Sequence, residues 1–411
     1  MNSMFGTTRL QGSLRFIALS SVGILMLGWN FVVCLGGTDQ PDDVTVHVGK
    51  TVEITASYKY LWYPTVHRFS TGEMLATMRM SPDETSPEGE FSAYCLSRDG
   101  GETWSRRYPM GAGANIDAAY TQVPRDDGAI WGLAAGYASM EPYPPGEKTD
   151  FHVTLTKFSR GGMEIQQIRD ARVHFSEPVE SVPVELFATK EKDASQLREV
   201  PSAQPFGAII DGPGGEWLNT VYYTAEGHPH QQRLVLIRSV DHGQTWDEAG
   251  LVAAAPPQNK LAPWMGNDGP NEAGLVRLSD SRLFCIFRSG GDNLGEAWSA
   301  DDGKTWSPPV SLGFKGVAPH LRLLSSGLVA FTTGRPGPVT LMFSSDEGKT
   351  WVGATTIFSG RSTRYSDLIE LEPGKLFVIY DSVPYWWGPI PPTDKLSKNA
   401  ICGTFVEVRR H

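Results

Sequence analysis

A tyrosine and a glutamate in this chain could do chemistry together if the fold brings them into contact. Tyr365 lies in the segment Arg-Tyr-Ser-Asp-Leu, and Glu272 opens an apolar run. A phenol, with an ordinary pKa of about 10, becomes a nucleophile only when a base takes its proton. Arg288 stands 16 residues after Glu272, and Arg335 stands 30 residues before Tyr365. Because a planar guanidinium binds a carboxylate through two parallel hydrogen bonds, these arginines could hold an anionic substrate.

A repeated turn indicates the architecture that must position these residues. The pattern Ser-x-Asp-x-Gly-x-Thr-Trp occurs four times, and each copy follows a β-rich run: Ser97–Trp104, Ser239–Trp246, Ser299–Trp306 and Ser344–Trp351. The Ser and Asp side chains can bond to nearby backbone amides, Gly can adopt positive φ, and Trp can pack the turn onto a sheet. We therefore interpret the copies as folding devices of a repeated supersecondary unit, and not as the active site.

The apolar runs around these turns predict six units of four strands each. A degenerate copy at Ser159–Met163 divides the long gap between the first and second turns. The strand that begins at Val44 has no unit of its own, so we expect it to complete the sixth unit and remove an exposed sheet edge. The predicted fold is all-β: one six-bladed β-propeller of four-stranded antiparallel blades over residues 44–411. The charged segment 171–203 is expected to be a surface insertion or a lid.

Composition excludes some classes of function. The net charge is −10 and no basic stripe is present, so we expect no nucleic-acid partner. The four cysteines show no metal-binding spacing, and we predict neither a metal site nor a cofactor.

The N-terminus has the features of an export signal. Arg9 and Arg15 precede an uncharged apolar run that begins at Phe16. Its length, about 20 residues, is at the border between a cleaved signal and a membrane anchor. Residues 1–37 are therefore predicted to be a signal peptide or a membrane tether, with the remainder of the chain outside the cytoplasm. The sequence does not predict the oligomeric state.

The repeated turns and the six predicted blades resemble the sialidase (neuraminidase) superfamily, whose members carry BNR or Asp-box repeats. The resemblance covers nearly the whole chain after residue 44. The segment around Tyr365 is similar to the Tyr-Ser-x-Leu segment of the family nucleophile. Sialic acid has a carboxylate on its anomeric carbon, which would repel an anionic nucleophile but not a neutral tyrosine. The resemblance implies that Tyr365 attacks, that Glu272 is its base partner, and that Arg288 and Arg335 bind the substrate carboxylate.

The same resemblance implies a general acid and shows one departure. The segment from Arg79 to Asp83 resembles the Arg…Asp loop of the family, which makes Asp83 the general acid/base and Arg79 a substrate-binding residue. The position of the first family arginine is occupied by Trp62, and Arg68, further along the chain, is a candidate substitute. A missing arginine would weaken the carboxylate site and broaden the range of sugars to consider.

Other polar residues at expected inner-strand starts add alternatives. The set comprises Asp117, Gln204, Asn267, Asp268, Asn271 and His320. Of these, Asp117 and His320 are taken as substrate-binding candidates. Asp117 or Asp268 could also pair with Glu272 in a hydrolase that uses two carboxylates.

These observations predict an exo-acting glycoside hydrolase of sialidase type, which releases terminal acidic sugars from a glycan or glycoconjugate. One alternative is a non-catalytic propeller that binds glycan or protein. Another is a hydrolase or lyase of the same fold that acts on other sugars. The hydrolase hypothesis requires Tyr365 and Glu272 to lie within hydrogen-bond reach of each other.

Overall fold

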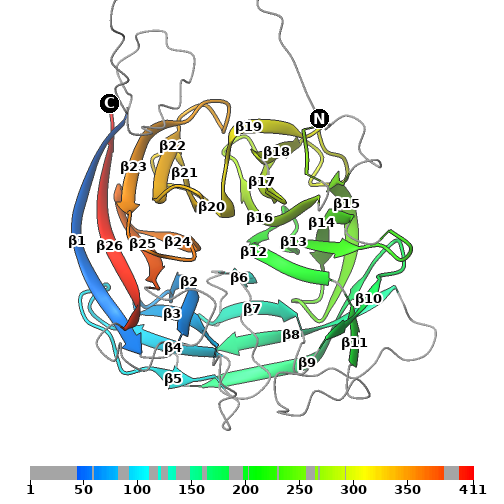
Figure 1. The fold of residues 1–411 in the computed structure, drawn as a ribbon, viewed down its shortest axis with the longest axis horizontal. Helices are drawn as coiled ribbons and strands as arrows, with labels where there is room; N and C mark the ends of the chain where they lie inside the picture. Colours follow the sequence, from blue (N-terminus) through cyan, green and yellow to red (C-terminus); the bar gives the residue numbers. More distant parts are fainter. Residues whose placement is uncertain are drawn as a thin grey trace, which may run out of the picture. The chain divides into compact units, whose positions relative to one another are not determined.

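The computed structural model describes residues 44–57, 60–81, 92–110, 119–121, 128–135, 149–159, 164–184, 198–201, 203–228, 231–255, 264–266, 269–291, 293–383 and 398–411. Every regular element in these ranges is a β-strand, as the composition predicts (Figure 1). Within the same ranges no helix has the length and apolarity needed to cross a membrane. The predicted signal or tether, residues 1–37, lies outside the described residues.

Four sheets are four-stranded and antiparallel. The first comprises β2 (Tyr60–Arg68), β3 (Met74–Ser81), β4 (Ser92–Ser97) and β5 (Tyr108–Pro109). The second comprises β16 (Pro270–Arg277), β17 (Leu283–Ser289), β18 (Asn293–Ser299) and β19 (Val310–Lys315). The third comprises β20 (Val317–Leu323), β21 (Val329–Gly334), β22 (Val339–Ser344) and β23 (Val352–Phe358). The last comprises β24 (Ser366–Glu372), β25 (Lys375–Ser382), β26 (Asn399–Arg410) and β1 (Val44–Ser57).

The N-terminal strand closes the last sheet, as predicted. β1 pairs antiparallel with β26, from Val44 opposite Arg410 to Ser57 opposite Asn399. The first described strand thus lies on the same sheet as the last one (Figure 1). This pairing covers the edge of β26, which would otherwise be free to pair with another chain.

One sheet is twice as large as predicted. It has eight strands: β6 (Ala119–Thr121), β7 (Ile130–Ala135), β8 (Asp150–Phe158), β9 (Ile165–His174), β12 (Ala203–Asp211), β13 (Trp217–Thr224), β14 (Gln232–Ser239) and β15 (Thr245–Ala254). Two antiparallel groups are joined because β15 pairs parallel with β9, with Thr245 opposite Arg172 and Asp247 opposite His174. The six predicted units therefore do not form six separate sheets.

The parallel pair also corrects the expected insertion at 171–203. Residues 171–174 are the end of β9, where Ala171 and Val173 are buried and alternate with partly exposed neighbours. The segment continues as β10 (Ser181–Val184), which pairs antiparallel with β11 (Arg198–Pro201). The predicted start of the insertion was therefore wrong, because its first residues complete a sheet.

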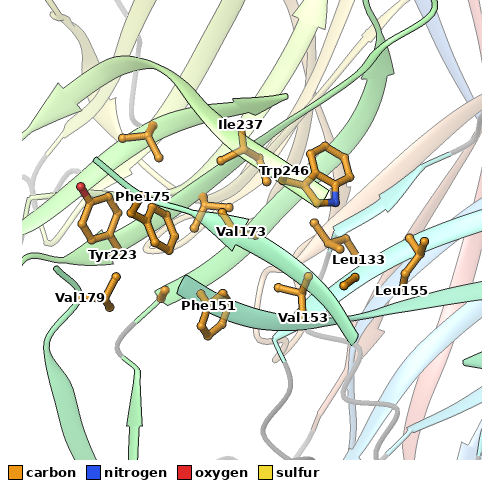
Figure 2. Close-up of a cluster of buried hydrophobic side chains, with 14 of the residues drawn as sticks. Leu133, Phe151, Val153, Leu155, Val173, Phe175, Val179, Tyr223, Ile237 and Trp246 are labelled. Atoms are coloured by element: carbon orange, nitrogen blue, oxygen red, sulfur yellow. The ribbon is translucent and has the colours of Figure 1, made fainter. Parts of the chain in front are cut away.

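Apolar clusters fill the space between neighbouring sheets or half-sheets. In the eight-stranded sheet, side chains of β8 and β9 such as Phe151, Val153 and Val173 share a cluster with Tyr223 and Trp246 from the other half (Figure 2). Burial of such clusters is the main stabilising contribution of the fold. The first strands of the units face the centre, since contacts run from β6 to β12, β16, β20, β24 and β2 (Figure 1).

The repeated turns have the predicted hydrogen bonds in all four copies. In the third copy, Ser299 Oγ donates to Asp301 Oδ1 at 2.9 Å, and Gly303 N donates to Ser299 Oγ at 2.8 Å. Thr305 N donates to Asp301 Oδ1 at 2.9 Å. Gly303 has φ +84°, and a Cβ there would overlap Leu236 in the preceding unit. Each turn therefore closes its own hairpin while it packs against its neighbour.

Candidate active site

Inner strands at the centre share a bulge near their first residues. Their pairing register shifts there in β2, β12, β16 and β20. A residue with positive φ lies in each bulge: Tyr63 (φ 50°), Gly207 (φ 80°), Glu272 (φ 41°) and Ala318 (φ 42°). A bulge changes the direction of a side chain, and residues other than glycine rarely adopt this conformation. The equivalent positions of neighbouring units thus direct different groups at the centre.

Among the four bulge residues, Glu272 has the side chain with the most hydrogen bonds in the described structure. Its Oε1 accepts a hydrogen bond from Arg288 Nη1 at 2.7 Å and another from the hydroxyl of Tyr365. Its Oε2 accepts a hydrogen bond from the backbone N–H of Ala318 at 3.1 Å. The carboxylate is buried, and three donors on three different strands or strand ends hold it in place. Two of the predicted site residues, Tyr365 and Arg288, therefore meet on one oxygen of Glu272.

Tyr365 keeps its proton in this environment. Burial raises the pKa of the Tyr365 hydroxyl well above its usual value, and the nearby Glu272 carboxylate raises it further. The ring packs against Phe206 and Ala318, which form a small apolar cluster beside it. In the resting state the phenol is thus a hydrogen-bond donor to Glu272, and that carboxylate is the described group placed to take its proton.

Arg288 provides the positive charge of the site. Burial disfavours its charged form, but the Glu272 carboxylate more than offsets this and holds the pKa of Arg288 above its ordinary value. The guanidinium also donates from Nε to the carbonyl of Gly290 at 3.2 Å. An ion pair that is largely removed from water is much stronger than one at the surface. Arg288 is therefore held in place by the Glu272 carboxylate and by the carbonyl of Gly290.

Tyr63 is a site residue that sequence reasoning missed. Its ring lies 4.2 Å from the ring of Tyr365, centroid to centroid, at an angle of 50°. It also stacks on Trp62 at 5.4 Å. The signal was available, because Tyr63 directly follows the tryptophan at the expected first-arginine position. The absence of an arginine at position 62 was interpreted as a loss of charge, and the aromatic side chain of Tyr63 was not considered.

Arg335 lies near Tyr365, but its hydrogen bond is to the backbone of Thr363, two residues before Tyr365. Its Nη2 donates to the carbonyl of Thr363 at 2.8 Å, and its guanidinium carbon is 6.0 Å from the centroid of the Tyr365 ring. The neighbouring Arg364 turns away and donates to the carbonyl of Phe358 at 3.1 Å. Of the two arginines, only Arg335 faces the nucleophile candidate.

His320 takes part in a buried polar cluster next to the site. Its Nδ1 lies 3.2 Å from Asp367 Oδ1, and its ring is 6.3 Å from the ring of Phe206. Asp367 also accepts from the backbone N–H of Val66 at 3.0 Å. Burial alone would raise the pKa of Asp367, but its interactions with His320 and Arg322 hold that pKa well below its usual range. His320 is therefore held in place by Asp367, and this contact gives no support to its predicted role in substrate binding.

Arg68 is not brought to the site. It ends β2 about 16 Å along the strand from Tyr63, and it donates to the carbonyls of Leu371 and Gly72. This placement does not support its use as a substitute for the first arginine. Arg79 is partly buried on β3, opposite Trp62. Asp83 and Asp117 lie outside the described residues, as do Asn267 and Asp268.

Comparisons with known proteins agree with this fold. Residues 207–378 match the BNR repeat-like domain. The predicted resemblance to the sialidase superfamily is thereby confirmed. A protein of unknown function from Dyadobacter fermentans has a TM-score of 0.64 at 20% identity, over 89% of this chain and 99% of its own. Among the curated proteins, no sequence matches this chain.

Two kinds of glycosidase share the fold of this chain. A Hadza microbial sialidase has a TM-score of 0.55 at 19% identity, over 78% of this chain, which spans 63% of that sialidase. An α-L-arabinanase from Penicillium chrysogenum, complexed with arabinobiose, has a TM-score of 0.57 at 15% identity, over 87% of this chain and 98% of its own. At these identities the likeness describes the fold, so function must be argued from the site.

Proposed function

We propose that this chain is a glycoside hydrolase in which Tyr365 is the nucleophile and Glu272 its base. The observation that carries the proposal is the contact between the two: the Tyr365 hydroxyl donates to Glu272 Oε1, on the oxygen that also receives Arg288. A tyrosine nucleophile with a carboxylate partner is one solution to glycoside hydrolysis. In this view the two halves of the eight-stranded sheet count as separate blades, which gives six around the site.

The first step forms a covalent glycosyl–tyrosine bond. Tyr365 Oη attacks the anomeric carbon while its proton passes to Glu272 Oε1, and the bond to the leaving oxygen breaks. That oxygen needs a proton, which we assign to Asp83 from its place in the family-like loop. In the second step a water loses a proton to Asp83 and attacks the same carbon. Tyr365 leaves and recovers its proton from Glu272, so both residues return to their starting states.

Arg288 adjusts this transfer. While Glu272 is anionic, the guanidinium stabilises it and the proton stays on Tyr365. When Glu272 takes the proton it loses that attraction, and the positive charge then favours the electron-rich phenolic oxygen nearby. One cation thus interacts favourably with the negative charge on either side of the transfer. A neutral residue at 288 would leave a buried charge without compensation in both states.

Tyr63 supports a second candidate, a hydrolase for sugars without an anomeric carboxylate. Next to Tyr365 the described site offers an aromatic ring, Tyr63, beside the place where the sequence resemblance expects an arginine. Aromatic faces pack well on the apolar faces of sugar rings, whereas an arginine serves a carboxylate. The chemistry of Tyr365 and Glu272 would be the same with either substrate.

Hydrolysis of a panel of chromogenic glycosides tests the proposal and separates the two candidates. The panel includes sialosides, uronides and neutral glycosides, and the full chain is compared with Tyr365→Phe. Release of a sialoside or uronide supports an acidic sugar, and release of a neutral glycoside supports the second candidate. In either case we expect Tyr365→Phe to lower kcat by about 10³-fold or more, because the nucleophile is lost.

A matched control is Tyr108→Phe, since Tyr108 is a half-buried tyrosine that packs on Tyr94 away from the site. It should leave kcat unchanged. If Tyr365→Phe kept activity within tenfold of the unaltered chain, the nucleophile assignment would be wrong. If a folded chain released no sugar from a broad panel, a glycan-binding propeller would replace the hydrolase.

We also propose that residues 1–37 export the chain. The support is the sequence pattern alone: two arginines followed by an uncharged apolar run. Fractionation of cells that produce the full chain tests this proposal. Recovery of the chain in the cytoplasm with residues 1–37 intact would contradict it.

A further inference from the structure

A buried aspartate, Asp381, gathers four hydrogen bonds next to the proposed nucleophile. It lies on β25, one residue beyond the last pair with β24, Tyr380 opposite Ser366, and it pairs with Ile401 of β26. Its side chain is fully buried. Oδ1 accepts from Ser362 Oγ at 2.8 Å and from Thr363 N at 2.7 Å. Oδ2 accepts from Thr363 Oγ1 and from Tyr63 N, the latter at 3.2 Å.

On one side, these bonds reach the backbone of Tyr365. The Ser362 hydroxyl that donates to Asp381 also accepts from Arg364 N at 2.8 Å. The Thr363 hydroxyl that donates to Asp381 also accepts from Tyr365 N at 3.4 Å. Asp381 is therefore the end of two short chains of hydrogen bonds that determine the path of the backbone into Tyr365.

On the other side, Asp381 holds the bulge of the first inner strand. Tyr63 has φ 50°, a strained conformation for a residue other than glycine. Its N–H is bonded to Asp381 although the two residues are 318 positions apart in sequence. The ring of Tyr63 then lies 4.2 Å from the ring of Tyr365. One carboxylate thus contacts the backbone support of both tyrosines.

We propose that Asp381 is a positioning residue that sets the separation and orientation of Tyr63 and Tyr365. It does not touch the substrate. It determines whether the sugar ring beside Tyr63 presents its anomeric carbon to Tyr365 Oη. This inference rests on the proposed function for its effect on catalysis, but its structural part, the spacing of the two rings, is independent of any activity.

Burial and charge explain why an aspartate is needed here. Burial raises the pKa of Asp381 above its ordinary value, and its hydrogen-bond donors oppose that rise. Each carboxylate oxygen faces two donors. An asparagine would have to place its NH₂ group against one pair of donors in either orientation, since its amide has only one acceptor oxygen. The substitution Asp381→Asn keeps the shape but breaks half of the network.

The repeated turn provides a matched control. Asp346 accepts from Ser344 Oγ at 2.8 Å, from Thr350 N at 2.8 Å and from Thr350 Oγ1 at 2.7 Å. These are the same donor groups, on the same oxygens, that Asp381 receives from Ser362 and Thr363. Asp346→Asn therefore reproduces the local loss of hydrogen bonds in a turn that has no contact with the tyrosines.

The experiment compares Asp381→Asn with Asp346→Asn in the full chain. We expect Asp381→Asn to lower kcat by about 10²-fold with KM changed less than threefold, because a displacement of about 1 Å at the reacting atoms has such an effect. Asp346→Asn should keep both constants. In crystal structures, the separation of the Tyr63 and Tyr365 rings should change by more than about 0.5 Å in Asp381→Asn only.

The outcomes separate this inference from the proposed function. If the ring separation changes but no variant or parent chain hydrolyses any glycoside, the positioning role stands and the hydrolase fails. If Asp381→Asn keeps both the ring separation and kcat, the positioning role is wrong. If Asp381→Asn does not fold, Thr363→Val replaces it, because it removes only the hydroxyl between Asp381 Oδ2 and Tyr365 N; an unchanged kcat and ring separation in that variant would also overturn the inference.

Discussion

The outer turns and the inner bulges both recur around the sheets, but only the turns keep their residues. Each of the four turns has the same serine, aspartate, glycine, threonine and tryptophan, and the same hydrogen bonds between the first four. The inner bulges keep their backbone conformation but change their side chains, to Tyr63, Gly207, Glu272 and Ala318. The backbone conformation is therefore repeated in both regions, whereas the side chains are repeated only in the turns.

The difference has a physical reason. A turn performs the same task in every unit, so the same donors and acceptors recur. A bulge at the centre directs its side chain at a site that all the units share, so each unit supplies a different group. At Gly207 a side chain is excluded, because a Cβ would overlap the carbonyl oxygen of Ala273. In a repeated fold, a position with conserved geometry and varied residues is therefore a good place to search for function.

The largest expected effect lies at the centre, for Glu272→Gln. A glutamine cannot take the proton of Tyr365, and its NH₂ group would face donors of the carboxylate. We expect kcat to fall by about 10³-fold, within the range for loss of a general base. The unfolding midpoint should fall as well, because the partly buried Arg288 loses its charged partner. Steady-state kinetics and urea unfolding measure the two effects.

The control for that variant is Glu248→Gln. Glu248 is a partly buried glutamate that accepts from Ser176 N at 2.9 Å, on an outer strand. It should alter neither kcat nor KM. If kcat fell by less than tenfold in Glu272→Gln, Glu272 would not be the general base. The bulge at 272 would then have a structural role, like the turns.

A loss of stability without a loss of kcat is expected at a turn, for Gly303→Ala. Gly303 has φ +84°, and a Cβ there would overlap Leu236 in the neighbouring unit. Gly100→Ala is the control, since Gly100 has φ +72° and open space around its Cβ position. We expect Gly303→Ala to lower the free energy of unfolding by about 3 kcal/mol and Gly100→Ala by about 1 kcal/mol. Neither should change kcat. Equal losses in urea unfolding would show that the turn does not pack against its neighbour as described.

The turns were also the part of the fold that could be predicted best. Their signal is local: five residues within eight that determine one hairpin end. The closure of the last sheet by β1 followed from a single leftover strand. The joined eight-stranded sheet was not predicted, because the parallel pairing of β15 with β9 depends on how two units lie side by side and has no local pattern.

The contact between Tyr365 and Glu272 was predicted, because the family resemblance pointed to both residues. Tyr63 and Asp381 were missed because their roles depend on contacts over more than 300 positions, which exist only after the ring closes. The Ala318 contribution to Glu272 is a backbone N–H, which any residue type other than proline supplies. It is therefore easier to identify reactive side chains from sequence patterns than to identify the groups that position them.

Glu296, on β18, is a position where one copy of the unit differs from the other copies. It stands three residues before Ser299 of its turn, where the other copies have Tyr94, Leu236 and Leu341. The carboxyl is buried, and burial raises the pKa of Glu296 to about 8. An unfolded chain would lose this proton near pH 4.5, so the folded state binds more protons between these values. Stability due to this group therefore falls as pH rises from about 4.5 to about 8.

We expect Glu296→Gln to remove this loss. At pH 4 or below, the variant and the unaltered chain should have similar stability, and near pH 7 the variant should be more stable by on the order of 3 kcal/mol. Urea unfolding at several pH values measures the difference. The same difference at every pH would mean that the carboxyl does not titrate in this range.

The smallest effect distinguishes copies of the turn from one another. Trp246 Nε1 donates to the carbonyl of Gly243 at 2.8 Å, whereas Trp351 Nε1 is buried and has no hydrogen-bond partner among the described residues. Both indoles pack in apolar clusters, so Trp→Phe removes similar packing from each. Only Trp246→Phe also removes a hydrogen bond, and we expect it to be the more destabilising by about 1 kcal/mol. Equal losses in urea unfolding would mean that packing alone keeps tryptophan in the turn, and that the copies are equivalent in energy as well as in sequence.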